Sequence, residues 1–231
     1  MKKKYICMMA WAVIAAFCLT ACSDDDKLPT VTPSASGTMT DNDGNEYHWV
    51  RIGSLDWMTE NLHDGIPFYE DTYNDKYGFY GLSISTLDEA QEQFADYGNY
   101  YSWQEAMDNA PEGWRLPTDD DWKNLEGTLG MKQADLDREG WRPGCSTLMT
   151  QKNEGTMLNF VYGGQICYYS WQYSVFHDCD YGYYWTGTKT SVNGEDAAYA
   201  RMFTPGKNAV NRLQILHAEH FLNVRYVRDA K

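Results

Sequence analysis

The chain opens with a hydrophobic segment that stands apart from the rest of the sequence. Three lysines, Lys2–Lys4, precede an almost uninterrupted apolar run over residues 5–20. A positive end followed by a short apolar run and small residues is typical of a secretory signal peptide. A retained transmembrane helix is the alternative, but the run is shorter than the roughly 20 residues that cross a ~30 Å hydrocarbon layer comfortably. The pattern therefore predicts export.

The segment that follows predicts a lipid anchor. The apolar run ends in Leu19-Thr20-Ala21-Cys22, which resembles the lipobox of bacterial lipoproteins. This resemblance implies cleavage after residue 21 and acylation of Cys22, for example with palmitate, which holds a protein on a membrane without a spanning helix. Residues 23–26 read Ser-Asp-Asp-Asp and resemble the signal that sends Bacteroidetes lipoproteins to the outside of the outer membrane. A merely solvated acidic tether is the alternative.

A polar stretch without apolar periodicity separates this anchor from the rest of the chain. Residues 27–38 contain two prolines and several serines and threonines, which is typical of a flexible linker. The division that we expect is therefore a signal peptide over residues 1–21, a lipidated acidic tether and linker over residues 22–38, and one domain over residues 39–231.

The domain begins with the pattern of a β-hairpin. The polar run Asp41–Asn45 separates Thr38 and Met39 from an aromatic and branched segment, residues 47–52. Its Asp-x-Asp-Gly order also begins calcium loops, but such a loop closes on a glutamate at position 12, which here is Ile52. A turn between two strands is the favoured interpretation.

Capping boxes predict two short helices in the first half of the domain. Ser102 with Glu105, and Thr118 with Asp121, have the spacing at which a hydroxyl and a carboxylate satisfy the first backbone N–H groups. Apolar residues follow both boxes at helical spacing: Trp103, Ala106 and Met107, then Trp122, Leu125 and Leu129. Residues 86–95 are a third candidate with little apolar surface.

The second half has the pattern of an antiparallel sheet. Short runs rich in Tyr, Trp and Val alternate with Gly, Asp and Asn. The expected strands are residues 158–162, 183–188, 198–203, 210–216 and 222–228. Helices followed by strands indicate an α+β domain rather than an alternating βαβ one.

Composition narrows the class of protein further. The 231 residues carry 33 acidic and 19 basic side chains, a net charge of −14, so binding to a nucleic-acid backbone is not expected. Aromatic residues make up 15% of the chain and large aliphatic ones are few, so the core is expected to be rich in aromatic rings.

Three cysteines remain in the domain after cleavage and acylation: Cys145, Cys167 and Cys179. Only two of them can pair, and a Cys167–Cys179 disulfide closes the shorter loop in an oxidising envelope. The alternative is that all three are small buried hydrophobic residues in a reducing niche.

Candidate chemistry is sparse. The sequence contains no nucleophile elbow and no phosphate-binding glycine loop. The histidine-containing segments 177–180 and 217–220 each place at most two metal ligands on one face of an extended chain. Neither a metal nor a cofactor is therefore expected. Tyr169, Trp171 and Tyr173 would share one side of an extended segment and form a stacking platform for a glycan. The alternative is that these rings belong to the core.

Several segments, in order, resemble one known family. They are Asp43-Gly44-Asn45, Trp57-Met58-Thr59-Glu60-Asn61-Leu62, Tyr97-Gly98, Gly113-Trp114-Arg115-Leu116-Pro117-Thr118, Tyr184-Trp185-Thr186-Gly187-Thr188 and Val224-Arg225-Tyr226-Val227-Arg228-Asp229. Over residues 39–229 they resemble the Fibrobacter succinogenes major paralogous domain of secreted and lipid-anchored proteins. Residues 68–96 look like an insertion, and Tyr226 stands where the family often has a cysteine, which argues against a family disulfide there.

Residues 113–118 together with Trp122 are also similar to a segment of the formylglycine-generating-enzyme fold, which is related to C-type lectins. The resemblance implies a compact, loop-rich, C-type-lectin-like α+β fold. An oxidase of that kind needs a suitably placed pair of cysteines to hold copper. The three cysteines of this domain lie beside strand-like, tyrosine-rich segments and do not match that arrangement. Arg115 is expected to order loop carbonyls or a carboxylate such as Glu60.

These patterns favour a surface-anchored, non-catalytic recognition or adhesion lipoprotein of the outer membrane, with a glycan or a surface protein as its partner. A structural or assembly component of the envelope or of a surface appendage is the alternative. An enzyme of unknown reaction is the third hypothesis.

Overall fold

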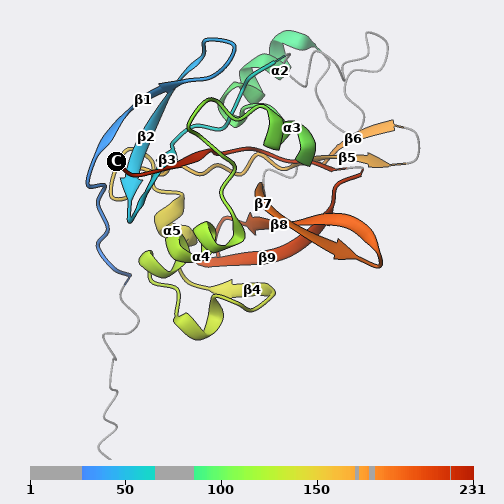
Figure 1. Ribbon diagram of the computed structural model, residues 1–231. Helices are drawn as coiled ribbons and strands as arrows, with labels where there is room; N and C mark the ends of the chain where they lie inside the picture. Colours follow the sequence, from blue (N-terminus) through green and yellow to red (C-terminus); the bar gives the residue numbers. More distant parts are fainter. Residues whose placement is uncertain (1–27, 66–85, 170–171, 177–179, 219) are drawn as a thin grey trace, which may run out of the picture.

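Figure 1 follows the chain through the part that the structure describes. This computed structural model describes residues 28–65, 86–169, 172–176, 180–218 and 220–231. Its helices there are α2 (Leu87–Phe94), α3 (Trp103–Asp108), α4 (Asp119–Thr128) and α5 (Ser146–Met149), with 3₁₀ turns at Ala95–Tyr97 and Gln133–Asp135. None of the helices in this part of the chain is long and apolar enough to cross a membrane.

The first and last strands lie in the same sheet. Its order is β1-β2-β3-β11, all antiparallel neighbours. The strands are β1 (Ser36–Thr40), β2 (Glu46–Ile52), β3 (Leu55–Met58) and β11 (Val227–Asp229). At the β1–β2 turn, Asp41 Oδ1 accepts the backbone N–H groups of Asp43 at 3.0 Å and Asn45 at 2.8 Å. The predicted hairpin is confirmed.

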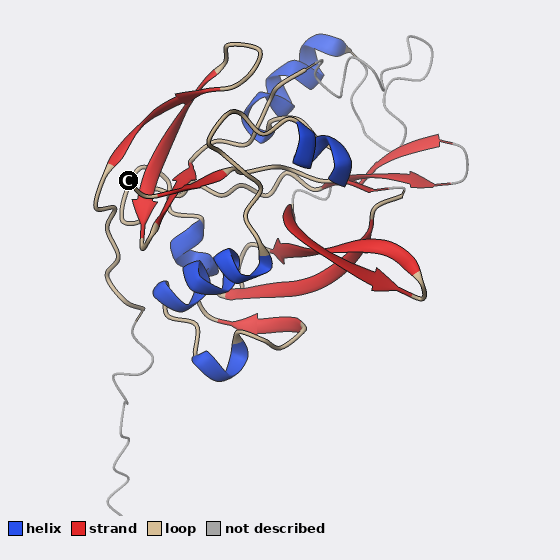
Figure 2. Ribbon diagram, viewed as in Figure 1, coloured by secondary structure: helices blue, strands red, loops and turns tan. Residues whose placement is uncertain are grey.

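A second antiparallel sheet holds the long strands of the C-terminal half. Its order is β4-β9-β8-β7. The strands are β4 (Gly140–Pro143), β9 (Ala209–Leu216), β8 (Glu195–Phe203) and β7 (Gly182–Val192). Figure 2 shows the short helices beside these sheets. The α+β class, with most strands in the second half, is confirmed.

Two of the expected strands differ from the prediction. Residues 158–162 have no regular structure: Phe160 N–H donates to the carbonyl of Met149, and Val161 N–H donates to the hydroxyl of Tyr184. The 222–228 segment is a strand only from Val227. Its apolar side chains follow a strand pattern, but before Val227 its backbone bonds change partner from one residue to the next. Leu222 bonds to Tyr101, Asn223 to β7 and Tyr226 to Met58 of β3, so isolated bridges form instead of a continuous strand.

A small third sheet has the order β10-β5-β6. It contains β10 (His220–Phe221), β5 (Gln165–Tyr169) and β6 (Gln172–Phe176). Tyr169 is the register partner of Gln172, and Tyr168 that of Tyr173. The expected single extended segment is therefore divided between two antiparallel strands, with Tyr169 at the end of β5 and Tyr173 in β6.

The predicted helices begin at their predicted caps. Ser102 N–H donates to the Glu105 carboxylate at 2.8 Å in α3, and Thr118 N–H donates to the Asp121 carboxylate at 2.7 Å in α4. In both cases the hydroxyl accepts the N–H of the acidic residue, which completes the capping box. The third candidate is also a helix, α2, capped by the hydroxyl of Thr86.

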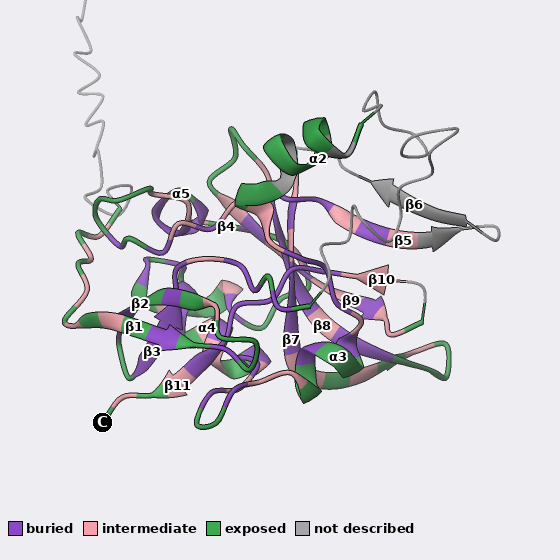
Figure 3. Ribbon diagram, turned by 90° about the horizontal axis from the view of Figure 1, so that it is seen from above, coloured by how far each residue is buried: buried purple, intermediate pink, exposed green. Residues whose placement is uncertain are grey.

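The core is aromatic, as predicted, and lies on both sides of β7. Tyr184 belongs to one hydrophobic cluster and Trp185 to the other, because successive residues of a strand face opposite sides. In the first cluster the Trp122 ring lies 5.3 Å from both Trp57 and Phe160. Figure 3 shows the buried strands inside the molecule and α2 exposed on its outside.

A buried network of charges connects α4 to the second sheet. The Glu126 carboxylate accepts from Arg142 at 2.8 Å and from Arg201 at 2.6 Å, and Asp119 accepts from Arg201 and Arg212 at 2.8 Å. Burial acts to raise the pKa of Asp119, but hydrogen bonds and charges from Arg212 and Arg201 outweigh it and lower this pKa to about 2. The pattern of the sequence gave no sign of this network.

The stretch expected to be a flexible linker is largely packed against the domain. Val31 is partly buried against the first hydrophobic cluster. Ser34 N–H donates to the Arg51 carbonyl at 3.0 Å, and Arg51 N–H donates to the Ala35 carbonyl at 2.8 Å. Backbone pairing in β1 starts at Ser36, three residues before Met39. Isolated contacts of this kind leave no periodicity in a sequence, which explains the difference.

Candidate functional site

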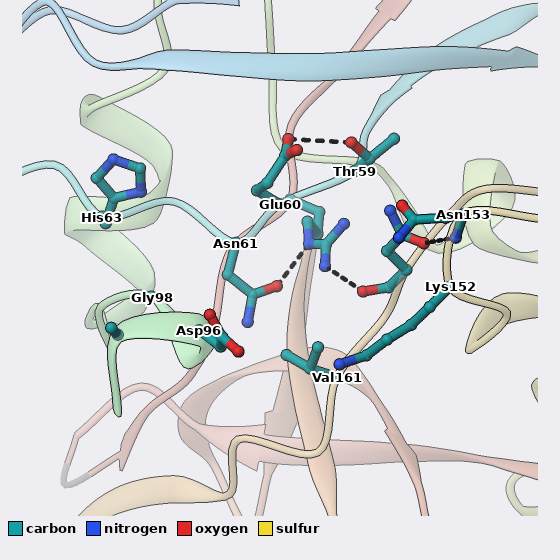
Figure 4. A pocket seen from close by; sticks show the side chains of 12 residues that line it. Thr59, Glu60, Asn61, His63, Asp96, Gly98, Lys152, Asn153 and Val161 are labelled. Atoms are coloured by element: carbon teal, nitrogen blue, oxygen red, sulfur yellow. Dashed lines mark hydrogen bonds between the residues drawn. The ribbon is translucent and has the colours of Figure 1, made fainter. Parts of the chain in front are cut away.

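A cavity of about 300 Å³ opens where four separate stretches of chain meet. They are residues 59–63 after β3, residues 95–98 after α2, the loop of residues 152–161, and Arg225 before β11. Figure 4 shows their side chains around the cavity. Most of these side chains are polar, so the cavity presents hydrogen-bonding groups on several sides.

A second cavity of about 270 Å³ adjoins the first, since both are lined by Asp96, Lys152 and Val161. It adds an aromatic lining from Tyr97, Phe160 and Tyr162. We call the two adjoining cavities the Lys152 groove. In Figure 4 the Lys152 side chain extends toward Val161, where the two cavities meet. The groove thus has a polar part and an aromatic part.

The floor of the polar part is a buried arginine. Arg225 is only 2% exposed, and its guanidinium donates to Asn61 Oδ1 and to the carbonyls of Met58 at 3.0 Å, Leu158 at 2.9 Å and Asn159 at 2.9 Å. All four of these acceptors are neutral oxygens. Burial therefore lowers the pKa of Arg225 from its ordinary value. The arginine ties three distant segments together and fixes the shape of the groove.

One wall of the groove depends on a glycine. Gly98 has φ +70°, and a Cβ atom there would lie 2.7 Å from the Asn61 Cβ and from the Leu62 carbonyl. Only glycine permits this close approach in the left-handed region. It brings the 3₁₀ turn beside residues 61–62, where Asn61 Nδ2 donates to the Tyr97 carbonyl at 2.8 Å.

The opposite wall is a loop with several left-handed positions. Asn153, Met157 and Asn159 all have φ between 53° and 56°. Asparagine tolerates this conformation better than most residues, and Asn159 Oδ1 accepts the Asn153 N–H at 3.0 Å. These local bonds define the path of the loop that carries Lys152.

The opening of the groove offers both donors and acceptors. Glu60 is 43% exposed at its side chain, where it accepts the His48 N–H at 2.8 Å and the Thr59 hydroxyl at 3.0 Å. Asp96 and Lys152 are exposed. Among the described residues, no group of three or more His, Cys, Asp or Glu side chains could hold a metal ion. The groove is therefore equipped for hydrogen bonding to a polar molecule.

The residues predicted to bind a ligand lie next to this groove in the sequence. Tyr169 ends β5 and Tyr173 is the second residue of β6, while Trp171 lies outside the described residues. Strand β5 begins at Gln165, three residues after Tyr162. The binding role of the three aromatic residues stays a prediction.

The other predicted sites have different outcomes. Cys22 and Cys179 lie outside the described residues, so the lipid anchor and the Cys167–Cys179 disulfide stay predictions. Cys145 is a buried free thiol, and burial raises its pKa. The His217 ring stacks on Trp103 with their centroids 4.3 Å apart.

Arg115 has a structural role, but not with the predicted carboxylate. Its guanidinium contacts Asp121, the capping residue of α4, and Asp229 in β11. Glu60 bonds elsewhere, because Arg115 lies beside β11, where its N–H donates to the Val227 carbonyl. Arg115 therefore joins the start of α4 to the last strand.

Sequence reasoning did not single out the residues of the groove. Glu60 and Asn61 stood among the residues that carry the family resemblance, but no ligand-binding role was assigned to them. A usable signal was the polar Thr-Glu-Asn run directly after the buried Trp57 and Met58. Asp96 and Lys152 carry no such signal, since only the folded chain brings them together.

The protein is thus a small α+β domain with a surface groove that is lined mainly by loops. The chain belongs to the Fibrobacter succinogenes major domain family, whose model matches residues 50–228. Neither the curated proteins nor the solved structures compared with this chain gave a match.

Proposed function

We propose that this protein is a surface-anchored, non-catalytic recognition lipoprotein that binds a glycan in the Lys152 groove. The observation that carries the proposal is the junction of a polar and an aromatic lining at Asp96, Lys152 and Val161. Sugars present C–H faces that pack on aromatic rings and hydroxyls that need both donors and acceptors. The groove offers these groups within one depression.

The individual groups suit hydroxyl recognition. Glu60 and Asp96 supply carboxylate acceptors, Lys152 supplies a charged donor, and Tyr97 and Tyr162 supply ring surfaces. Arg225 holds the floor through backbone carbonyls, so its role is to shape the site. A site that is shaped in advance loses less conformational freedom when a ligand binds.

The location and fold are part of the same proposal. Cys22 and the acidic residues after it support anchoring on the outside of the outer membrane. Two features support a C-type-lectin-like fold. The strands β1, β2, β3 and β11 pair in one sheet, which brings the first and last strands together, and the loop-rich region that lines the groove lies between β3 and β11 in the sequence.

The test is a glycan array followed by titration with any glycan that binds. We expect Lys152→Ala and Asp96→Asn each to weaken binding by roughly tenfold or more, since a hydrogen bond to a charged group contributes ~1.5–3 kcal/mol. Lys132→Ala removes an exposed lysine outside the groove and is the matched control.

Three outcomes distinguish the alternatives. If the folded protein binds no glycan on the array, glycan recognition is rejected. A protein partner captured by cross-linking in intact envelopes would then favour a structural or assembly role. If Trp171→Ala abolishes binding in a folded protein while Lys152→Ala does not, the ligand lies at the β5–β6 hairpin. If Trp171→Ala unfolds the domain, that ring belongs to the core.

A further inference from the structure

The N-terminal segment of the described chain is fixed to one end of the domain. Pro29 packs beside Gly130, just after α4, so closely that a Cβ atom on Gly130 would lie 2.7 Å from Pro29 Cδ. Val31 packs on the first hydrophobic cluster, and the backbone of residues 34–35 bonds to Arg51. The chain therefore joins the body of the domain at Pro29 and does not leave it again before β1.

This packing limits the distance between the domain and a lipid on Cys22. Five residues lie between Cys22 and Leu28, and a fully extended chain spans at most about 20 Å from one to the other. A free linker over residues 22–38 would reach about 60 Å. A domain of this size has a diameter of roughly 40 Å, so the short tether cannot let it turn freely above a membrane.

We infer that the domain rests beside the bilayer that holds Cys22, with the end formed by Leu28, Gly130 and Lys132 facing the lipid surface. This inference rests on the proposed lipid anchor. Figure 1 places α2 at the end of the molecule away from the first described residues (blue), and Asp96 of the groove lies in the 3₁₀ turn that follows α2. The tether thus directs the groove away from the membrane, toward ligands outside the cell.

The test uses the full lipidated protein in vesicles of phosphatidylethanolamine and phosphatidylglycerol that contain an acceptor dye on a lipid. A clickable amino acid carries the donor dye at Lys132, near the tether, or at Asp88 in α2; both residues are exposed. We expect energy transfer at Lys132 to exceed that at Asp88 by about twofold or more, because the two positions lie at opposite ends of a domain roughly 40 Å across.

A second variant tests the tether itself. A Gly/Ser insertion of about 12 residues between Lys27 and Leu28 should bring the two efficiencies close together, since a flexible chain permits many orientations. Equal transfer from both positions with the native tether would overturn the inference. Failure of the unlabelled parent to stay on the vesicles would instead reject the lipid anchor, so the two failures are distinguishable.

Discussion

At the scale of single residues, buried charges differ in how they are compensated. Glu126 has no exposed surface and binds Arg142 and Arg201, which are equally buried. Arg225, in contrast, donates to neutral carbonyl and amide oxygens. The first arrangement depends on the presence of an anion, and the second depends on the exact backbone path around the groove.

Glu126→Gln should therefore be one of the most damaging single changes in the core. The amide keeps the shape but removes the negative charge, which leaves Arg142 buried without its anionic partner and Arg201 with Asp119 alone. Breaking a buried pair in this way costs ~3–5 kcal/mol. Urea denaturation of the parent and the variant measures the loss, with Glu112→Gln at an exposed position as the control. Equal midpoints for the parent and Glu126→Gln would contradict the structural role of the network.

Asp64 should make stability depend on pH in the opposite direction from Asp119. Burial and the neighbouring Asp43 raise the pKa of Asp64 from 3.8 to about 6. The folded protein thus binds this proton more tightly than the unfolded chain does. The stabilising contribution is complete below pH ~4 and is lost as the pH rises through about 6.

Asp64→Asn removes this titrating group while its backbone carbonyl still accepts from Tyr101 and Asn99. We expect the variant to be more stable than the parent at about pH 7.5 and the difference to shrink toward pH ~4. Denaturation midpoints across this pH range provide the measurement. A difference that stays constant with pH would show that Asp64 does not titrate as described.

At the scale of elements, the helix starts are the features most closely tied to local sequence. Thr118→Ala removes the hydroxyl that accepts the Asp121 N–H at 3.1 Å, so we expect a loss of ~1 kcal/mol. The control is Thr147→Ala, at an exposed position in α5. An unchanged denaturation midpoint for Thr118→Ala would mean that the cap contributes nothing to the stability of α4.

Strands were less predictable than helices because their partners lie far away in the sequence. Residues 158–162 have the composition of a strand, yet the N–H of Val161 bonds to the Tyr184 side chain instead of a neighbouring strand. The run from Tyr168 to Tyr173 is divided between β5 and β6, which are paired with each other. Propensity describes how well a residue suits a sheet, and the available partner decides whether a strand forms.

At the scale of the whole molecule, the proposed lipid anchor on Cys22 is what would place the groove at the cell surface. Cys22→Ala should abolish acyl labelling and release the protein from membranes, because the acyl chains on Cys22 are the proposed attachment to the bilayer. Ser23→Ala is the control, since it leaves the acylated cysteine in place. Membrane partition that persists in Cys22→Ala would indicate that residues 5–20 are retained as a spanning helix.

The sequence by itself determined the hairpin at Asp41–Asn45, the caps at Ser102 and Thr118, the aromatic core and the family. The hairpin, the caps and the family motifs each depend on residues a few positions apart, and the aromatic core depends on composition. Local spacing and composition can both be read from a single sequence. Only the tertiary structure decided the Lys152 groove, the Glu126 network and the packing of Pro29 and Val31. The bond from Arg225 to Asn61 joins residues 164 positions apart, and a contact over that separation exists only once the chain has folded.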